Sequence, residues 1–276
     1  MGKNKQMIFG ISIGHFFNDL LVSFVPSMMF MLAISHKLTI VQQTLILAFL
    51  SFTSSMLQPV ISKFVLFLGK KVLIFSVIWI AVFTSAISFT SSFLELFILV
   101  GLAGIASSIY HPVGSALTLN LSNKSKGFSL GLFMTVGGVA ASFSPLFFAM
   151  MTKSGDFRKL LFIVPIGLIV AFIMYALKTD ELDFDFINKS SSRANHVEFC
   201  TYKWIGVLIL LTTIRSVVYK VMLSFGVQVL TYEVISKSHL VFIFLLVSTL
   251  GTLIGGYVSD RIPSKLLFVA SNFQLC

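Results

Sequence analysis

Three polar side chains capable of chemistry interrupt an apolar stretch near the N-terminus. His15, Asn18 and Asp19 lie within residues 8–34, a segment long enough to cross a bilayer as a helix. Their spacing of i, i+3 and i+4 places them on one helix face. A carboxylate at that depth costs several kcal/mol unless it faces protein or water. The sequence therefore predicts a functional polar site on this helix.

Two further ionisable residues fall at a similar depth on other predicted helices. Counted from the expected cytoplasmic ends, Asp19, His111 and Arg215 all lie roughly 15–18 Å from the inner surface. We expect the three to share a polar cavity. An intramembrane arginine favours an acidic partner, so Asp19 and Arg215 are expected to pair. His111 is expected to exchange a proton beside Asp19.

Each of these residues has a purely structural alternative. Asp19 and Asn18 would serve as hydrogen-bonding groups between helices, and His15 as a packed core residue. His111 precedes Pro112, which frees a backbone carbonyl and kinks a helix, so the role of His111 would then be local. These alternatives stay open from the sequence alone.

The composition is that of a helical membrane protein with many spans. The chain is 57% hydrophobic and only 11% charged, whereas soluble domains are about a quarter charged. The net charge of +10 does not indicate a nucleic-acid partner, because the basic residues lie in turns between apolar spans, where they set topology. Cys200 and Cys276 form neither a disulfide framework nor a metal-binding pattern. We expect no cofactor and no metal.

Apolar spans alternate with polar turns along the chain. Lysine and arginine concentrate in the turns on the side of the N-terminus, with residues 153–159 as the exception, which predicts a cytoplasmic N-terminus. Residues 178–203 are polar and without apolar period, which indicates a cytoplasmic linker. The predicted helices cover about 7–35, 40–68, 72–91, 93–121, 127–151, 159–177, 204–232 and 239–258, and a ninth begins at 266.

This layout predicts two helical bundles joined by the linker. Residues 1–177 form a bundle of six helices, and residues 204–276 begin a second bundle with helices 7, 8 and part of 9. Weak internal similarity supports the repeat, because residues 58–73 (QPVISKFVLFLGKKVL) and 252–267 (TLIGGYVSDRIPSKLL) each end an apolar helix, turn with basic residues and enter another. Two such halves are typical of a transporter.

Several motifs resemble the major facilitator superfamily, and within it the fosmidomycin resistance family of drug efflux transporters. They are GHFFND (14–19), LQP (57–59), GIASSIYHP (104–112) and KGFSLGLFMTVGG (126–138) with a later Pro145. GGYVSDRIPSK (255–265) resembles the superfamily's loop signature, with Gly256, Asp260, Arg261 and Lys265 in their places. The resemblance implies alternating access, proton-coupled export of a small drug, and a cavity lined by helices 1, 4, 7 and 10. Asp19, His111 and Arg215 fall on the first three.

The chain also departs from that family. Ser62 and Leu66 replace the glycine and aspartate of the first loop signature, and Pro263 and Ser264 replace residues of the second. Most of helix 9 and all of helices 10–12 are absent. We therefore expect a C-terminally truncated transporter. The alternatives are a truncated fragment that does not transport, and one half of a split transporter that a separately encoded remainder completes.

The function expected from the sequence is secondary active transport across the inner (plasma) membrane. Protons and a small molecule such as fosmidomycin are the expected partners, together with the lipid bilayer. A membrane-embedded enzyme using His111 and Asp19 is a rival interpretation. Against it, the chain has no HExxH or GxSxG motif and no paired carboxylates within a span, so we expect no enzymatic activity.

Overall fold

The computed structural model describes residues 3–61, 64, 69, 71–122, 125–151, 156–181, 206–207, 209–214, 216–217, 221 and 234–262. Within that part of the chain every regular element is helical. Seven of these helices are long and apolar enough to cross a membrane. The predicted all-α membrane fold is therefore confirmed for the described residues.

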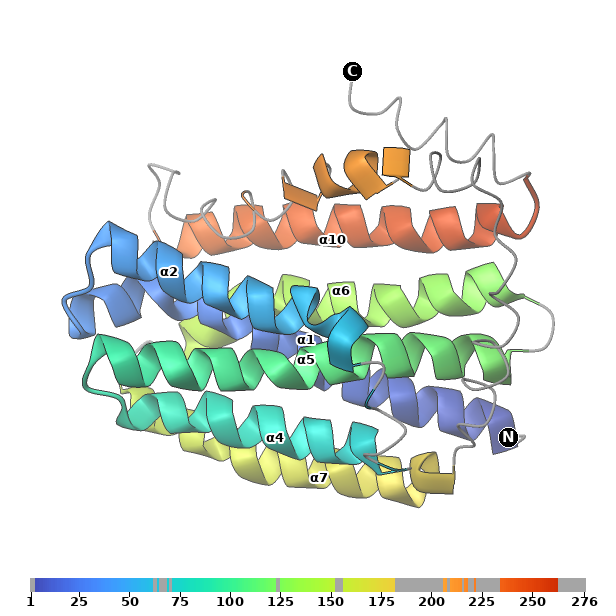
Figure 1. Ribbon diagram of the computed structural model, residues 1–276, viewed down its shortest axis with the longest axis horizontal. Coiled ribbons are helices and arrows are strands. Elements are labelled where there is room, and N and C mark those ends of the chain that lie inside the picture. The colour runs from blue at the N-terminus through green and yellow to red at the C-terminus, as the bar shows by residue number, and fades with distance from the viewer. Residues whose placement is uncertain are drawn as a thin grey trace.

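Short helical turns accompany the long helices, and three of them lie within spans. The long helices are α1 (Lys3–Ser35), α2 (Ile40–Ser51), α4 (Val72–Ala86), α5 (Phe93–Leu121), α6 (Lys126–Met151), α7 (Ile163–Ala176) and α10 (Val234–Ser259). The short turns are η1 (Phe52–Met56), η2 (Ile87–Phe89), η3 (Phe157–Phe162) and η4 (Thr179–Glu181). The helices run side by side along the long axis of the molecule (Figure 1).

Helix α1 occupies the centre of the bundle. It packs against α6 on one side and against α5, α7 and α4 on the others, while α4 is covered by α5 and α7. On its far side α6 packs against α10, the outermost of these helices (Figure 1). The buried face of α1 therefore lies against α6, α5, α7 and α4, and a site on that face can be completed by these helices.

Local sequence explains where the helices begin. Ser92 and Glu95 form a capping box at the start of α5, in which the Ser92 hydroxyl accepts from the Glu95 N–H and the Glu95 carboxylate accepts from the Ser92 N–H. Thr39 and Gln42 do the same for α2. Such reciprocal bonds satisfy backbone donors that a helix start leaves unpaired. They set the register of α5 and hence the position of His111.

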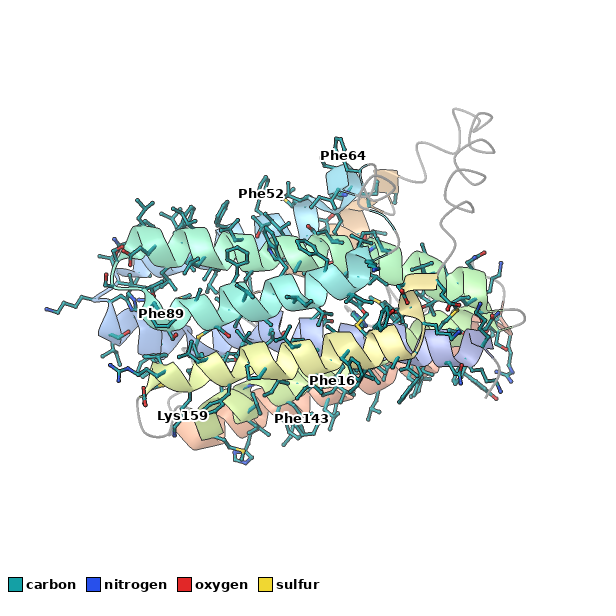
Figure 2. All side chains as sticks on the ribbon, turned by 90° about the horizontal axis from the view of Figure 1, so that it is seen from below. Phe16, Phe52, Phe64, Phe89, Phe143 and Lys159 are labelled. Atoms are coloured by element: carbon teal, nitrogen blue, oxygen red, sulfur yellow. The ribbon has the colours of Figure 1, made fainter. Side chains whose placement is uncertain are left out.

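Apolar side chains cover both the inside and the outside of the bundle. Tyr110, Phe24 and Phe133 are among the largest fully buried side chains. Other phenylalanines point outward, among them Phe52 and Phe89, which are labelled on the surface in Figure 2. In water such exposure would be unfavourable, but lipid tails are as apolar as these rings. The distribution is that of a protein whose solvent is the bilayer.

Some predicted helix limits were wrong. The second helix was expected over residues 40–68, but η1 is a π-helical turn in its middle. The end of this helix beyond Ile61 lies mostly outside the described residues. Pro59 lacks an N–H and its ring crowds the carbonyl four residues earlier, so a widened turn before it is physically reasonable. The third helix ends at Ala86 and is followed by the tighter turn η2, short of the predicted residue 91. The linker beyond residue 181, most of helix 7 and the ninth helix lie outside the described residues.

Candidate functional site

His15 is held rigidly at the centre of the bundle. Its side chain is fully buried, and its ring stacks on Phe133 of α6 with centroids 3.9 Å apart, and on Tyr110 of α5 at 6.0 Å. The His15 Nδ1 lies 2.8 Å from the backbone carbonyl of Phe133. The Tyr110 hydroxyl donates in turn to the Ile11 carbonyl on α1, at 2.7 Å. Three helices therefore fix the orientation of this imidazole.

The Asp19 carboxylate bridges two histidines. Its Oδ2 lies 3.2 Å from His15 Nε2, and its Oδ1 lies 3.2 Å from His111 Nε2. The Asn18 amide donates to Asp19 Oδ1 at 3.0 Å. The two imidazoles also approach each other, with 3.3 Å between His15 Nε2 and His111 Nδ1. The structure thus brings together His15, Asn18, Asp19 and His111. We call the three ionisable residues, His15, Asp19 and His111, the triad site.

The triad site needs one additional proton to form all of its hydrogen bonds. Two neutral imidazoles and an ionised carboxylate do not carry enough protons for these contacts. The Phe133 carbonyl can only accept, so His15 Nδ1 must donate to it. A neutral His15 then has a lone pair at Nε2, facing a carboxylate that also only accepts. The contact is favourable when a proton lies between them, either as an imidazolium at His15 or as a carboxylic acid at Asp19. All of these contacts are therefore satisfied together only when the site carries that additional proton.

The two ends of the triad site differ in burial. The side chains of His111 and Asp19 are 23% and 17% exposed, whereas that of His15 is 1% exposed. The buried Asn18 Oδ1 finds no hydrogen-bond donor among the described residues. The site is thus deeply buried at His15 and partly exposed at Asp19 and His111.

Gly137 makes this close packing possible. A Cβ built on Gly137 would lie 2.5 Å from His15 Cε1 and 2.8 Å from His15 Nε2, and would also clash with Asp19 Oδ2. The absence of a side chain lets α6 approach the imidazole face directly. The sequence analysis did not connect Gly137, Phe133 or Tyr110 with the polar face of α1. The available signal was a glycine four residues after Phe133, because this spacing puts both residues on the face of α6 that meets the polar face of α1.

The other predicted polar residues have separate fates. Asp260, after the end of α10, accepts hydrogen bonds from the backbone N–H groups of Gly127 and Phe128, both at 2.9 Å. A carboxylate is stabilised at a helix N-terminus, so this contact ties α10 to the start of α6. The Arg261 guanidinium lies over the Tyr257 ring, 3.6 Å from its centroid. Arg215 and Lys265 lie outside the described residues, and the expected pairing of Arg215 with Asp19 stays a prediction.

Gly256, the remaining residue of the loop signature, packs against α6. A Cβ at this position would lie 2.8 Å from the Gly127 carbonyl oxygen and 2.8 Å from the Gly131 Cα. Gly138 instead faces the side chain of Thr249 on α10. We call this line of contacts, Gly127, Gly131 and Gly138 against Gly256 and Thr249, the glycine seam. Around Gly256 it is backbone-to-backbone packing of the kind found between membrane helices.

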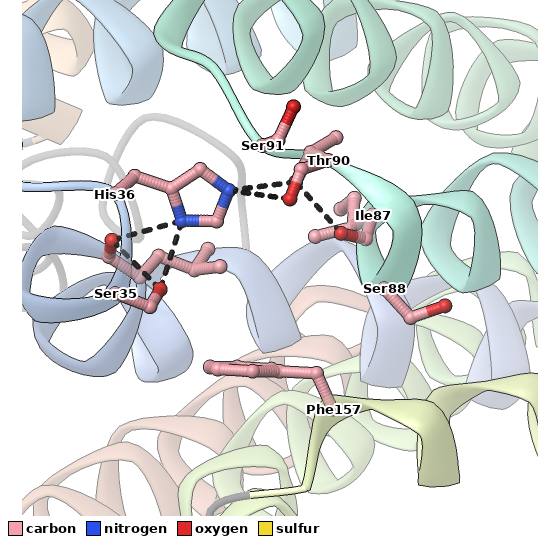
Figure 3. A pocket seen from close by; sticks show the side chains of 8 residues that line it. Ser35, His36, Ile87, Ser88, Thr90, Ser91 and Phe157 are labelled. Carbon is pink, nitrogen blue, oxygen red and sulfur yellow. Dashed lines mark hydrogen bonds between the residues drawn. The ribbon is translucent and has the colours of Figure 1, made fainter.

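A separate cavity lies at the C-terminal end of α1 (Figure 3). The rise of a helix puts this end roughly 25 Å from Asp19. The cavity has a volume of about 250 Å³ and is lined by Leu32, Ser35, His36, Ile87, Ser88, Thr90, Ser91 and Phe157. His36 Nε2 lies 2.9 Å from the Thr90 carbonyl and 3.0 Å from its hydroxyl. These contacts tie the end of α1 to the turn before α5, so the cavity is distant from the triad site.

Fold and site together define a multi-pass helical membrane protein with a buried polar centre. The sequence pattern of the Major Facilitator Superfamily matches residues 11–275, so the chain belongs to that family. Proteins of this family are transporters rather than enzymes, which agrees at the family level with the expected lack of enzymatic activity.

Two curated proteins resemble the chain along most of its length. An "Uncharacterized MFS-type transporter YfnC" from Bacillus subtilis (strain 168) is 24% identical over 281 residues, covering 95% of this chain and 67% of that protein. The "Fosmidomycin resistance protein" of Escherichia coli (strain K12) is 24% identical over 278 residues, covering 95% of this chain and 66% of that protein. The chain thus spans about two thirds of the length of each. The predicted superfamily is confirmed.

Proposed function

We propose that the chain acts in proton-coupled efflux of a small drug, as an antiporter of the inner membrane. The observation that carries this proposal is the triad site, where Asp19 lies between His15 and His111 in the middle of the spans. The similarity to a fosmidomycin resistance protein supports a substrate of that kind. The basic turns on the side of the N-terminus support a cytoplasmic N-terminus.

Coupling would arise because the proton holds two helices together. With the proton present, Asp19 of α1 accepts hydrogen bonds from His15 on its own helix and from His111 on α5. When the proton leaves, the lone pair of His15 Nε2 faces the carboxylate, and the polar centre becomes repulsive. Protonation therefore favours the packed arrangement of α1 against α5, and loss of the proton favours a looser one.

The loop signature would act as the latch on the cytoplasmic side. Asp260 holds the first turn of α6 through two backbone N–H groups, and these bonds would break when α10 moves away from α6. Arg215 would bias the protonation of Asp19 or hold an anionic group of the substrate. The complete motion would be the rocking of two bundles around a site near the midplane, as in related inverted-repeat transporters.

A susceptibility assay tests this proposal directly. The chain is expressed in a strain lacking its own efflux pumps, and growth is measured against a concentration series of fosmidomycin. We expect resistance above the empty vector, and its loss in Asp19→Asn at an unchanged level of membrane-inserted protein. Asp180→Asn is the matched control, because it removes an acid outside the spans. Equal resistance for Asp19→Asn and the unmodified chain would refute proton coupling at this site.

A proton-flux measurement separates coupling from substrate choice. Purified chain is reconstituted in vesicles containing a pH-sensitive dye, and the drug is added on one side. We expect drug-dependent proton movement for the unmodified chain and none for Asp19→Asn. Movement of protons with another small drug but not with fosmidomycin would keep the mechanism and reject the substrate.

A further inference from the structure

The triad site has the composition of a transition-metal site. Its three ionisable residues each offer one ligand atom, two imidazole nitrogens and one carboxylate oxygen, and these atoms lie within 4.8 Å of one another. Two histidines and one carboxylate form a donor set that proteins use for zinc and for ferrous iron. The ligands come from α1 and from α5, 96 residues apart, so no local sequence pattern indicated such a site.

The distances agree with tetrahedral coordination. With metal–nitrogen bonds of 2.0–2.1 Å, neighbouring ligand atoms around zinc are separated by about 3.3 Å. His15 Nε2 lies 3.2 Å from Asp19 Oδ2 and 3.3 Å from His111 Nδ1. Two of the three edges of the ligand triangle therefore already have the required length. A small turn of the exposed His111 ring would direct one nitrogen to the same point.

The surroundings support the ligands in the way that metal sites require. Metal-binding histidines commonly donate their second ring N–H to a backbone carbonyl, and His15 Nδ1 does so to Phe133 at 2.8 Å. That bond leaves the Nε2 lone pair directed at Asp19 and His111. The Asn18 amide orients the carboxylate through its bond to Oδ1.

We propose that His15, Asp19 and His111 form a binding site for a divalent transition-metal cation, with Zn²⁺ as the representative ion. The inference depends on the geometry of the site and not on the transport of any drug. Mg²⁺ and Ca²⁺ prefer oxygen ligands and should bind poorly to a set with two imidazoles. A bound ion would replace the hydrogen bonds of the triad site and hold α1 to α5.

Direct binding to the purified full chain tests the site. The protein is prepared in detergent with a histidine-free affinity tag, in a Cys200→Ser and Cys276→Ser background that removes both thiols, and is stripped with a chelator. Titration calorimetry with Zn²⁺ and visible absorption with Co²⁺ then measure binding. We expect one ion per chain, intense tetrahedral-type Co²⁺ absorption, and no binding of Mg²⁺.

Variants assign the ion to its ligands. His111→Gln and Asp19→Asn are expected to weaken Zn²⁺ binding at least about 100-fold. Asn18 only orients the carboxylate, so Asn18→Leu is expected to weaken binding about 10-fold. His239→Gln is the control, because it removes an exposed histidine from α10. Equal Zn²⁺ affinity in the unmodified chain and in His111→Gln would overturn the proposal.

A second measurement needs no variant and so does not depend on variant folding. X-ray absorption of the Zn²⁺-loaded chain should show two imidazole ligands and additional oxygen ligands at about 2.0–2.2 Å. A shell of oxygen ligands alone would overturn the proposal. Metal binding without drug resistance would support this inference and reject the proposed function, and drug resistance without metal binding would do the reverse.

Discussion

The packing of Gly137 against His15 allows one substitution to test the whole site. In Gly137→Ala the new methyl carbon would lie 2.5 Å from His15 Cε1, whereas ordinary contacts of this kind begin at 3.4 Å. About 1 Å of displacement is therefore needed. The His15 ring cannot supply it easily, because Phe133 and Tyr110 lie on its two faces. The helices α1 and α6 must move apart instead.

The cost follows from overpacking. Adding one methyl group to a well-packed interior typically costs about 1–3 kcal/mol. At about 2–4 °C per kcal/mol for a chain of this size, the midpoint of thermal unfolding should fall by about 2–12 °C. Separation of the helices would also lengthen the contacts of Asp19 with the histidines. We therefore expect weaker Zn²⁺ binding and loss of drug-dependent proton movement in the same variant.

The assay compares two glycine-to-alanine variants in detergent. Gly255→Ala is the matched control, because Gly255 is exposed on α10 and a Cβ there meets no described atom within 4 Å. It should unfold at the same temperature as the unmodified chain or slightly higher, since alanine favours a helix over glycine. An unfolding midpoint for Gly137→Ala equal to that of Gly255→Ala, with Zn²⁺ binding intact, would refute the packing of His15 against α6.

Two other contacts give predictions at the N-terminal side of the bundle. Asp260→Asn retains only one acceptor oxygen for two N–H groups, so amide hydrogen exchange at Gly127 and Phe128 should become about tenfold faster. The control Asp180→Asn should leave this exchange unchanged. Unaltered exchange in Asp260→Asn would contradict the latch. Hydrogen bonds from Lys3, which has the larger effect, and from Lys178 hold the pKa of Glu181 below its usual 4.5. Because the folded pKa is lowered, this contribution is present above pH 4.5 and is lost as the pH falls through the folded value. Protection of the backbone amides at the start of α1 from hydrogen exchange, corrected for the intrinsic exchange rate, should therefore fall on acidification. If a Glu181→Gln variant showed the same pH dependence, the ion pair would not be its cause.

The sequence predicted the helices well because the bilayer demands long apolar spans. The limits of α1 and α5 agree with the prediction to a few residues, since apolar runs and polar turns mark them clearly. The interruption of the second helix at η1 was missed, because hydropathy alone does not distinguish a π-helical turn from a regular one. The turn depends on local geometry near Pro59, which a count of apolar residues ignores.

The site was only partly predictable for a different reason. Depth along the helix placed Asp19 and His111 at one level, and the structure brings them within hydrogen-bonding distance. Depth does not specify rotation, so the partners of His15 on α6 could not be found. Phe133 takes part through its backbone carbonyl, which every residue possesses, and through its ring, which is one of 30 phenylalanines in the chain. Gly137 takes part through the side chain it lacks. Neither contribution distinguishes these residues in the sequence.

The glycine seam has a mechanical consequence. The rings and hydrogen bonds around His15 fasten α1, α5 and α6 to one another. Between α6 and α10, glycines bring the backbones close together, and the ring pairs Phe128–Tyr257 and Phe143–Phe242 add side-chain contacts. Sliding of α10 along α6 would have to separate these two ring pairs and the Asp260 bonds, while α6 stays joined to the histidines.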